Sequence, residues 1–110
     1  AEGLPNYPEL YALVKDRLLE GVTLDEVASR LGETPSAISH RLKRKFGMSF
    51  SEYVGRIRID MAKQYLRRTG LSATDVAHRV GIADQSNFSK LFRKLEGVSP
   101  SSYRKSHGKE

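Results

Sequence analysis

The sequence predicts an all-α protein in which two small helix-turn-helix subdomains are joined by a long linker helix, about seven helices in all. Two observations support this prediction. Residues 49–68 have the features of one long helix, and the sequences on either side of it resemble each other. The predicted parts are an arm or linker at 1–8, a first subdomain at 9–48, the linker helix at 49–68 and a second subdomain at 69–110.

The linker helix is expected to begin after Ser49, because Ser49 and Glu52 have the S-x-x-E spacing of a capping box. Thr69 and Gly70 end it. Between these limits apolar residues recur at helical spacing and form one stripe: Tyr53, Val54, Ile57, Met61, Ala62, Tyr65 and Leu66. At ~1.5 Å per residue, the helix is expected to be about 28 Å long.

The flanking sequences match each other at a nearly constant offset. The pattern V-A-x-R-x-G occurs at 27–32 and again at 76–81, an offset of 49 residues. The pattern G-x-S-x-x-x-Y occurs at 47–53 and again at 97–103, an offset of 50. Two copies are too few for a solenoid, so the repeat indicates a tandem pair of small helical units.

The first subdomain is expected to hold three helices. An apolar face predicts the first helix at 9–20, and Thr23 and Gly32 bound the second as its caps. Thr34 caps the third helix, at about 35–46. So short a connection between the second and third helices requires a steep crossing, as in a helix-turn-helix.

The third helix is expected to have a core face and a polar face. Ile38, Leu42 and Phe46 form the core face. The outer face then carries Ser36, Ser39, His40, Lys43 and Arg44. Small hydrogen-bonding residues near the start of a helix, followed by cations, suit entry into a DNA major groove. An ordinary solvated face is the alternative, and Arg41 fits either face.

The second subdomain repeats this scheme. Ser72 and Gly81 bound a short helix, Asp84 caps a helix at about 84–95, and Ser99 caps a last helix before a tail at 104–110. An apolar stripe at Phe88, Leu91, Phe92 and Leu95 leaves a polar group near the start of the sixth helix: Gln85, Ser86, Asn87, Ser89 and Lys90. Glutamine and asparagine pair with adenine, and lysine reaches guanine, so this face suits base edges.

The charge is distributed unevenly along the chain. The net charge is +6, but residues 1–33 hold three Lys/Arg and seven Asp/Glu (−4), whereas residues 34–110 hold sixteen and six (+10). This asymmetry predicts a polyanionic partner. Nucleic acid is favoured over a membrane surface, because no helix combines a basic face with exposed bulky apolar residues. A basic face that only keeps the protein in solution is the alternative.

The composition excludes several other classes of protein. No apolar run has the length of a membrane span or a signal sequence, so we expect a soluble, cytoplasmic protein. The absence of cysteine excludes thiol nucleophiles, disulfides and thiolate metal sites. His40, His78 and His107 have no metal-ligand spacing, and no phosphate loop, dinucleotide fingerprint or nucleophile elbow occurs. We expect no enzyme activity, metal or cofactor in this chain.

Three longer motifs run through the chain. They are A-x-x-x-G-x-x-P-S-x-I-S-x-x-L-K-x-x-x-G-M-S-F-S-E-Y-V-x-x-x-R at 28–58, A-K-x-x-L at 62–66, and D-V-A-x-x-V-G-I-A-D-Q-S-N-F-S-K-L-F-R-K-x-x-G-V-S-P-S-S-Y-R at 75–104. In these motifs the chain resembles the DNA-binding domain of the bacterial AraC/XylS transcription regulators. The resemblance implies that the third and sixth helices are recognition helices, and that the protein activates or represses transcription by binding duplex DNA near promoters.

The resemblance assigns candidate roles by position. The expected base-contacting residues are Ser36, Ser39, His40, Gln85, Ser86, Asn87 and Lys90. The expected phosphate-contacting residues are Thr34, Lys43, Arg44, Arg93, Lys94 and Ser99. The chain departs from the usual pattern at four positions: His40 and Lys90 replace arginine, Arg41 replaces an apolar residue and Leu42 replaces phenylalanine. Lysine is a point charge rather than a bidentate fork, which weakens base discrimination.

The expected length of the linker helix suggests how one chain could read DNA. A strut of about 28 Å, with the width of the units added, places two recognition helices about one turn of B-DNA (~34 Å) apart. Both helices could then enter successive major grooves and read roughly 20 bp of asymmetric sequence. The resemblance is also compatible with contact to RNA polymerase and with an N-terminal sensor, receiver or dimerisation domain missing from this chain. The alternative function is a helical protein-interaction module or adaptor that uses the basic face.

Overall fold

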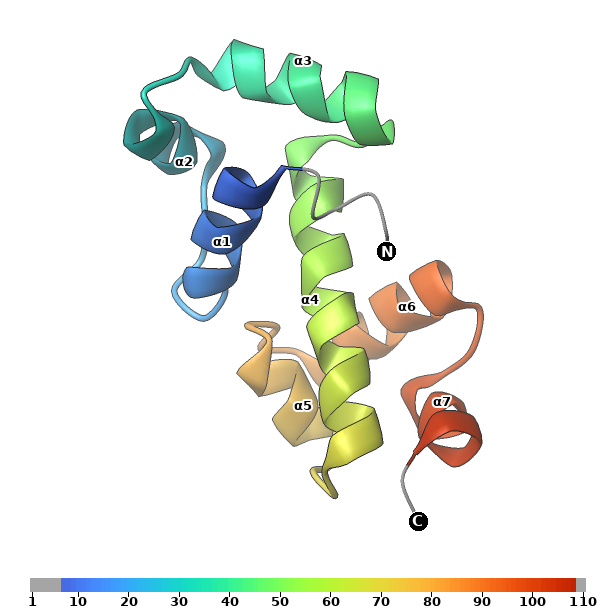
Figure 1. Cartoon of the computed structure of the whole chain (residues 1–110). Helices are drawn as coiled ribbons and strands as arrows, with labels where there is room; N and C mark the ends of the chain where they lie inside the picture. The colour runs from blue at the N-terminus through green and yellow to red at the C-terminus, as the bar shows by residue number, and fades with distance from the viewer. Residues whose placement is uncertain (1–6, 109–110) are drawn as a thin grey trace. The chain divides into compact units, whose positions relative to one another are not determined.

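The computed structural model describes residues 7–108, and every regular secondary-structure element in this range is an α-helix (Figure 1). The helices are α1 (Pro8–Asp16), α2 (Leu24–Leu31), α3 (Pro35–Phe46), α4 (Phe50–Arg68), α5 (Ala73–Arg79), α6 (Gln85–Glu96) and α7 (Pro100–His107). The predicted all-α fold of about seven helices is therefore confirmed. The chain divides into two compact units, Ala1–Gly55 and Arg56–Glu110, with the boundary inside α4. The subdomain limits drawn from the sequence remain a prediction.

The N-terminal region differs from the prediction. Most of the arm expected at 1–8 lies outside the described residues, and its last residue, Pro8, already begins α1. α1 ends at Asp16 rather than at residue 20, because the chain turns at Arg17, whose guanidinium forms ion pairs with Glu20 and Glu26. Leu18 still reaches the core from this turn and is buried.

Side-chain caps begin the helices where the sequence predicted them. Ser49 and Glu52 form the reciprocal capping box: the Ser49 amide donates to Glu52 Oε1 (2.8 Å), and the Glu52 amide donates to Ser49 Oγ (3.2 Å). Both candidate recognition helices end at a glycine in the left-handed region, Gly47 (φ 68°) after α3 and Gly97 (φ 82°) after α6. The remaining capping side chains are Thr23, Thr34, Ser72, Asp84 and Ser99.

The linker helix α4 buries the predicted stripe and one residue outside it. Tyr53 and Ile57 are fully buried, whereas Met61 and Tyr65 are only partly buried. Ile59 lies off the stripe, yet it is fully buried in the core of the second unit, together with Ala62, Leu66 and residues of α5, α6 and α7. The single stripe expected from the sequence is therefore incomplete.

Aromatic side chains hold α7 onto the core of the second unit. The Phe92 ring lies 5.9 Å from the Phe88 ring and meets the Tyr103 ring edge to face at 5.5 Å. The tail predicted from Arg104 is wrong, because α7 continues to His107. Arg104 donates to the backbone carbonyls of Leu66 and Thr69, both at 3.0 Å, and so ties this helix to the end of α4.

We predict that Phe92→Ala lowers the free energy of unfolding by about 3–5 kcal/mol, because the change leaves a cavity among buried aromatic rings. Denaturant titration followed by far-UV circular dichroism measures this loss. Val98→Ala is the matched control: Val98 is 41% exposed, so its loss should stay within about 0.5 kcal/mol. Equal losses in the two variants would contradict this assignment of the core.

Candidate nucleic-acid interface

α3 separates its core face from its polar face as predicted. Ile38 and Leu42 are fully buried, and Phe46 is partly buried and stacks on the Tyr53 ring of α4 at 5.7 Å. Ser39 is partly exposed, and the rest of the predicted outer face is exposed: Ser36, His40, Lys43 and Arg44. Apolar packing thus fixes the first candidate recognition helix through its core face, while its polar face is exposed to solvent.

A hollow of about 640 Å³ lies along the polar face of α3 within the first unit. Its lining brings together all three predicted base-contacting residues of this unit and the predicted phosphate contact Lys43, and it reaches the start of α4. The lining residues are Leu24, Pro35, Ser36, Ser39, His40, Lys43, Met48, Ser49 and Phe50. The hollow combines an apolar part with hydroxyl, imidazole and ammonium groups, which suits the mixed chemistry of base edges.

α6 presents its polar residues at its N-terminal end. Gln85, Ser86, Asn87 and Lys90 are all exposed. Gln85 Nε2 donates to Ser89 Oγ at 3.1 Å, which positions this amide along the helix, and the amide has a second N–H and a carbonyl oxygen with which it can pair with a base. The described residues therefore display every base-contacting side chain predicted for the second unit, and their role as base contacts remains a prediction.

The predicted phosphate contacts fall into two kinds. Arg93 and Lys94 are exposed cations in the last turns of α6. Thr34 and Ser99 instead cap helices: their hydroxyl oxygens accept hydrogen bonds from the amides of Ala37 and Ser102, both at 3.1 Å. A hydroxyl that accepts a bond in this way can still donate its hydrogen to a phosphate oxygen.

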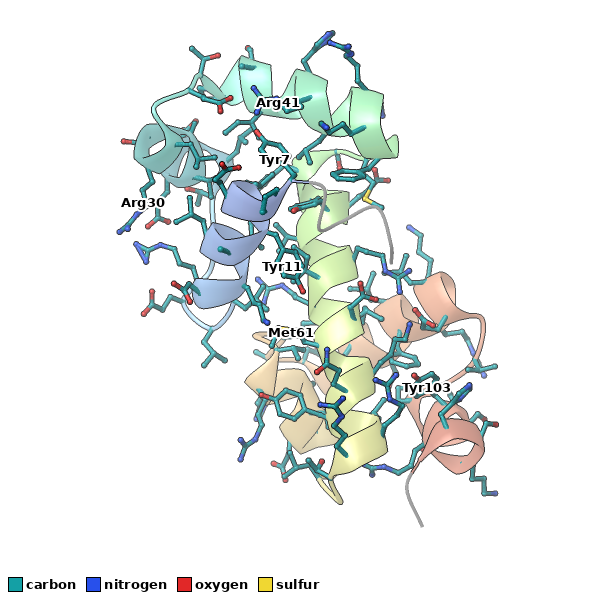
Figure 2. All side chains as sticks on the ribbon, in the orientation of Figure 1. Tyr7, Tyr11, Arg30, Arg41, Met61 and Tyr103 are labelled. Carbon is teal, nitrogen blue, oxygen red and sulfur yellow. The ribbon has the colours of Figure 1, made fainter. Side chains whose placement is uncertain are left out.

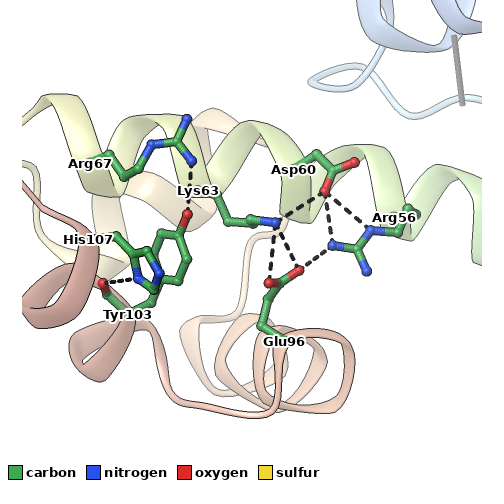
Figure 3. A network of polar contacts seen from close by, with 7 residues as sticks. All are labelled: Arg56, Asp60, Lys63, Arg67, Glu96, Tyr103 and His107. Atoms are coloured by element: carbon green, nitrogen blue, oxygen red, sulfur yellow. Dashed lines mark hydrogen bonds and ion pairs between the residues drawn. The ribbon is translucent and has the colours of Figure 1, made fainter. Parts of the chain in front are cut away.

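Ion pairs hold the end of α6 against α4, and sequence patterns did not reveal them (Figure 3). Arg56 binds both Asp60 (Nη2 to Oδ1, 2.9 Å) and Glu96, and the Lys63 ammonium lies 3.2 Å from Glu96 Oε1. Burial opposes ionisation of Glu96, but the hydrogen bonds from Arg56 and Lys63 outweigh burial and hold the pKa of Glu96 below its ordinary value. The ionised carboxylate thus anchors the sixth helix.

The turn between α5 and α6 is also tied down by polar contacts. Arg58 Nη1 donates to the carbonyl of Val80 at 2.6 Å, and burial lowers the pKa of the Arg58 guanidinium. His78 Nε2 lies 3.2 Å from the carbonyl of Ala83. The two bonds hold backbone carbonyls of the turn that precedes α6. The sequence offered one sign of them, since Arg58 closes the first long motif.

Arg41, whose orientation the sequence left open, is held by two side chains (Figure 2). Its Nη2 donates to Glu33 Oε1 at 3.0 Å and its Nη1 to Glu33 Oε2 at 3.3 Å. Nη1 also donates to the Tyr7 hydroxyl at 2.8 Å, and the guanidinium lies 5.0 Å from the centre of the Tyr7 ring. Neither partner was a candidate functional residue.

Residues 7–108 contain neither a cluster of metal-binding side chains nor a membrane-spanning helix. No group of three or more histidine, cysteine, aspartate or glutamate side chains in this range could hold a metal ion. No helix within it is both long and apolar enough to cross a bilayer.

Comparison with known sequences shows relatives over most of the chain. A family model described as "Helix-turn-helix domain" matches residues 27–106. The uncharacterized HTH-type transcriptional regulator YtdP of Bacillus subtilis is 42% identical over 83 residues, which are 76% of this chain and 11% of YtdP. The transcriptional activator RhaS of Escherichia coli is 34% identical over 95 residues, 86% of this chain and 34% of RhaS. The chain thus spans about a tenth to a third of these relatives.

Solved structures share the fold. The C-terminal domain of AraT, a response regulator from Geobacillus stearothermophilus, has a TM-score of 0.81 and 31% identity, covering 96% of this chain and 88% of that domain. The DNA-binding domain of AdpA, solved in complex with a target DNA, has a TM-score of 0.78 at 23% identity, covering 94% and 91%. The likeness to AdpA concerns the fold alone.

We predict that Glu96→Gln lowers stability at pH 7 by about 1–3 kcal/mol, because a neutral glutamine forms no ion pair with Arg56 and Lys63 and offers them one accepting oxygen instead of two. The lowered pKa means that the Glu96 carboxylate stabilises the fold above its unfolded pKa of about 4.3, and that this stabilisation is lost as the pH falls through the folded pKa. Urea titrations at pH 7 and pH 3 should therefore show a larger acid loss for the wild type than for the variant.

The exposed carboxylate of Asp16 supplies the control for this measurement. Asp16→Asn should lose as much stability in acid as the wild type does. An equal acid loss for Glu96→Gln and the wild type would contradict the anchoring role of Glu96.

Proposed function

Because the chain belongs to the AraC/XylS-type helix-turn-helix family of bacterial transcription regulators, we propose that it binds double-stranded DNA sequence-specifically through α3 and α6. One observation carries the proposal: both helices present polar and basic residues at matching positions of the repeat. At an offset of 50 residues, Ser36, Ser39, His40, Lys43 and Arg44 correspond to Ser86, Ser89, Lys90, Arg93 and Lys94. All of these residues are exposed except Ser39 and Ser89, which are partly buried.

In this proposal the N-terminal half of each helix reads bases. Gln85 and Asn87 carry amides suited to adenine, and the Lys90 ammonium suits the O6 and N7 of guanine. Ser86 and the α3 residues Ser36, Ser39 and His40 complete the base-reading set. The exposed amides and ammonium of α6 support a stronger base preference in the second unit than in the first.

The cations further along each helix hold the DNA backbone. Lys43 and Arg44 on α3, with Arg93 and Lys94 on α6, are exposed and can pair with phosphates. The hydroxyls of Thr34 and Ser99 add hydrogen bonds at capped helix starts. Each phosphate neutralised by a cation releases counterions, so affinity falls steeply with salt.

We further propose that the chain is the DNA-binding portion of a cytoplasmic regulator that acts near promoters and has no enzymatic activity of its own. The small share of YtdP and RhaS that it matches supports this interpretation. A sensor, receiver or dimerisation domain and a surface for RNA polymerase are compatible with it. If α3 and α6 enter successive major grooves, one chain reads roughly 20 bp without two-fold symmetry.

A protein-interaction adaptor with a basic face is the competing function. It needs no matched pair of polar helix faces, and it predicts no affinity for random duplex DNA. Fluorescence anisotropy with a random duplex at two salt concentrations separates the two functions, because DNA binding predicts a steep log–log salt dependence. Absence of binding at low salt would favour the adaptor.

We predict that Lys90→Ala and Lys94→Ala affect DNA binding differently. Lys90→Ala should lose about 1–3 kcal/mol on the cognate site and little on random duplex, because a base contact contributes only where the base is correct. Lys94→Ala should weaken both complexes and reduce the salt slope by about 0.9, because a phosphate contact is independent of sequence. Equal losses for Lys90→Ala on the two DNAs would refute its role as a base reader.

We predict that selection of bound sequences from a random duplex pool yields an asymmetric motif of roughly 20 bp. The motif should contain two separated blocks, one for each recognition helix. In a parallel selection with the Lys90→Ala variant, the base preference should weaken in one block only. A two-fold symmetric motif, or a single block of about half that length, would contradict reading by both helices of one chain.

A further inference from the structure

Arg41 occupies a position of the repeat that is apolar in the second unit. The residue 50 positions later is Leu91, which packs against the core of its unit. Arg41 cannot be accommodated in this way, and its side chain remains 41% exposed. It lies three residues before Arg44, so the two residues share one flank of α3. This flank is where the proposed function places a backbone contact.

The contacts of Arg41 withdraw its charge from that flank. The Glu33 carboxylate accepts from both terminal nitrogens of the guanidinium, at 3.0 and 3.3 Å, in a bidentate pair. The Tyr7 hydroxyl accepts a further bond at 2.8 Å, and its ring lies against the guanidinium at 5.0 Å. A phosphate could bind Arg41 only after these contacts were exchanged.

The two partners come from different parts of the first unit. Glu33 lies in the turn between α2 and α3, so it belongs to the helix-turn-helix itself. Tyr7 lies immediately before α1, is 4% exposed, and its carbonyl accepts from the Tyr11 amide at 3.0 Å. Tyr7, the residue directly before α1, therefore contacts a side chain of the first candidate recognition helix.

We propose that Glu33 and Tyr7 sequester Arg41, a latent phosphate contact of α3, and that Tyr7 thereby sets how strongly the first unit holds the DNA backbone. The inference rests on the proposed DNA binding. While the contacts with both Glu33 and Tyr7 are intact, Arg41 contributes nothing to the complex. When Tyr7 is displaced or Glu33 is neutralised, Arg41 joins Arg44 on the phosphates.

The salt dependence of affinity measures this release directly. One additional phosphate contact should make the slope of log K against log[salt] steeper by about 0.9, so the advantage of a released variant should shrink by about 3-fold between about 50 and 200 mM salt. Anisotropy titrations of the full 110-residue chain with random duplex supply the slopes. Random duplex is the suitable probe because a phosphate contact is independent of sequence.

Four variants test the sequestration. Glu33→Gln should steepen the slope, Arg41→Ala should leave it at the wild-type value, and the double variant Glu33→Gln/Arg41→Ala should return it to that value. Asp16→Asn, the fourth, makes the same charge change at an exposed site of α1 and should not change the slope. A slope for Glu33→Gln equal to that of Asp16→Asn would overturn the proposal, as would a shallower slope for Arg41→Ala.

Two substitutions test the part played by Tyr7. Tyr7→Leu keeps an apolar side chain but removes the ring and the hydroxyl, so it should steepen the slope. Tyr7→Phe keeps the ring and should lie between Tyr7→Leu and the wild type. An unchanged slope in Tyr7→Leu would overturn the role of Tyr7 in sequestering Arg41. Failure of the wild type to bind duplex at low salt would instead overturn the proposed function itself, and this inference with it.

Discussion

The linker helix α4 buries apolar side chains in the core of each unit. Units of about 55 residues are close to the lower limit for an independent hydrophobic core, so each needs apolar surface beyond its short helices. α4 supplies it: Tyr53 stacks on the last residue of α3, and Ile59 and Leu66 lie in the core beneath α6. The orientation of each candidate recognition helix is therefore set by contacts with α4, together with the turn that precedes the helix.

In the second unit, polar contacts add to the apolar packing that holds α6. Aromatic packing of Phe88 and Phe92 buries one face of α6, and hydrogen bonds add contacts of defined geometry at its ends. Glu96, held by Arg56 and Lys63, fixes one end of α6, and the bond from Arg58 to Val80 fixes the turn at the other. The candidate base-contacting residues of α6 therefore project from a helix constrained at both ends, as preorganised recognition would require.

Local signals made much of the fold predictable. Caps, terminal glycines and periodic apolar faces act within a few residues, so the limits of α3 and α6 and the capping box of Ser49 could be inferred from the sequence. Ile59, the early end of α1 and the continuation of α7 depend on contacts between residues distant in the chain, and no local pattern encodes them. For the same reason the candidate site could be predicted as a set of exposed polar residues, but the pair of Arg41 with Glu33 could not. That pair joins residues from different elements, and Tyr7 stood in a segment interpreted as an arm.

Differences between the two units suggest how they would divide the work of binding DNA. α6 carries two amides and an ammonium at its exposed start, groups that discriminate among bases. α3 carries serines and a histidine there, but it has exposed Lys43, Arg44 and Lys45 in its last turns and a fourth cation, Arg41, held by Glu33. Base discrimination depends on groups aligned with the groove, whereas backbone affinity depends on the number of unpaired cations. In the proposed function, the second unit therefore contributes most of the sequence preference. In the same proposal the exposed cations of α3 add backbone contacts to those of α6, and the contact between Tyr7 and Arg41 would adjust the contribution of the first unit without changing the preferred sequence.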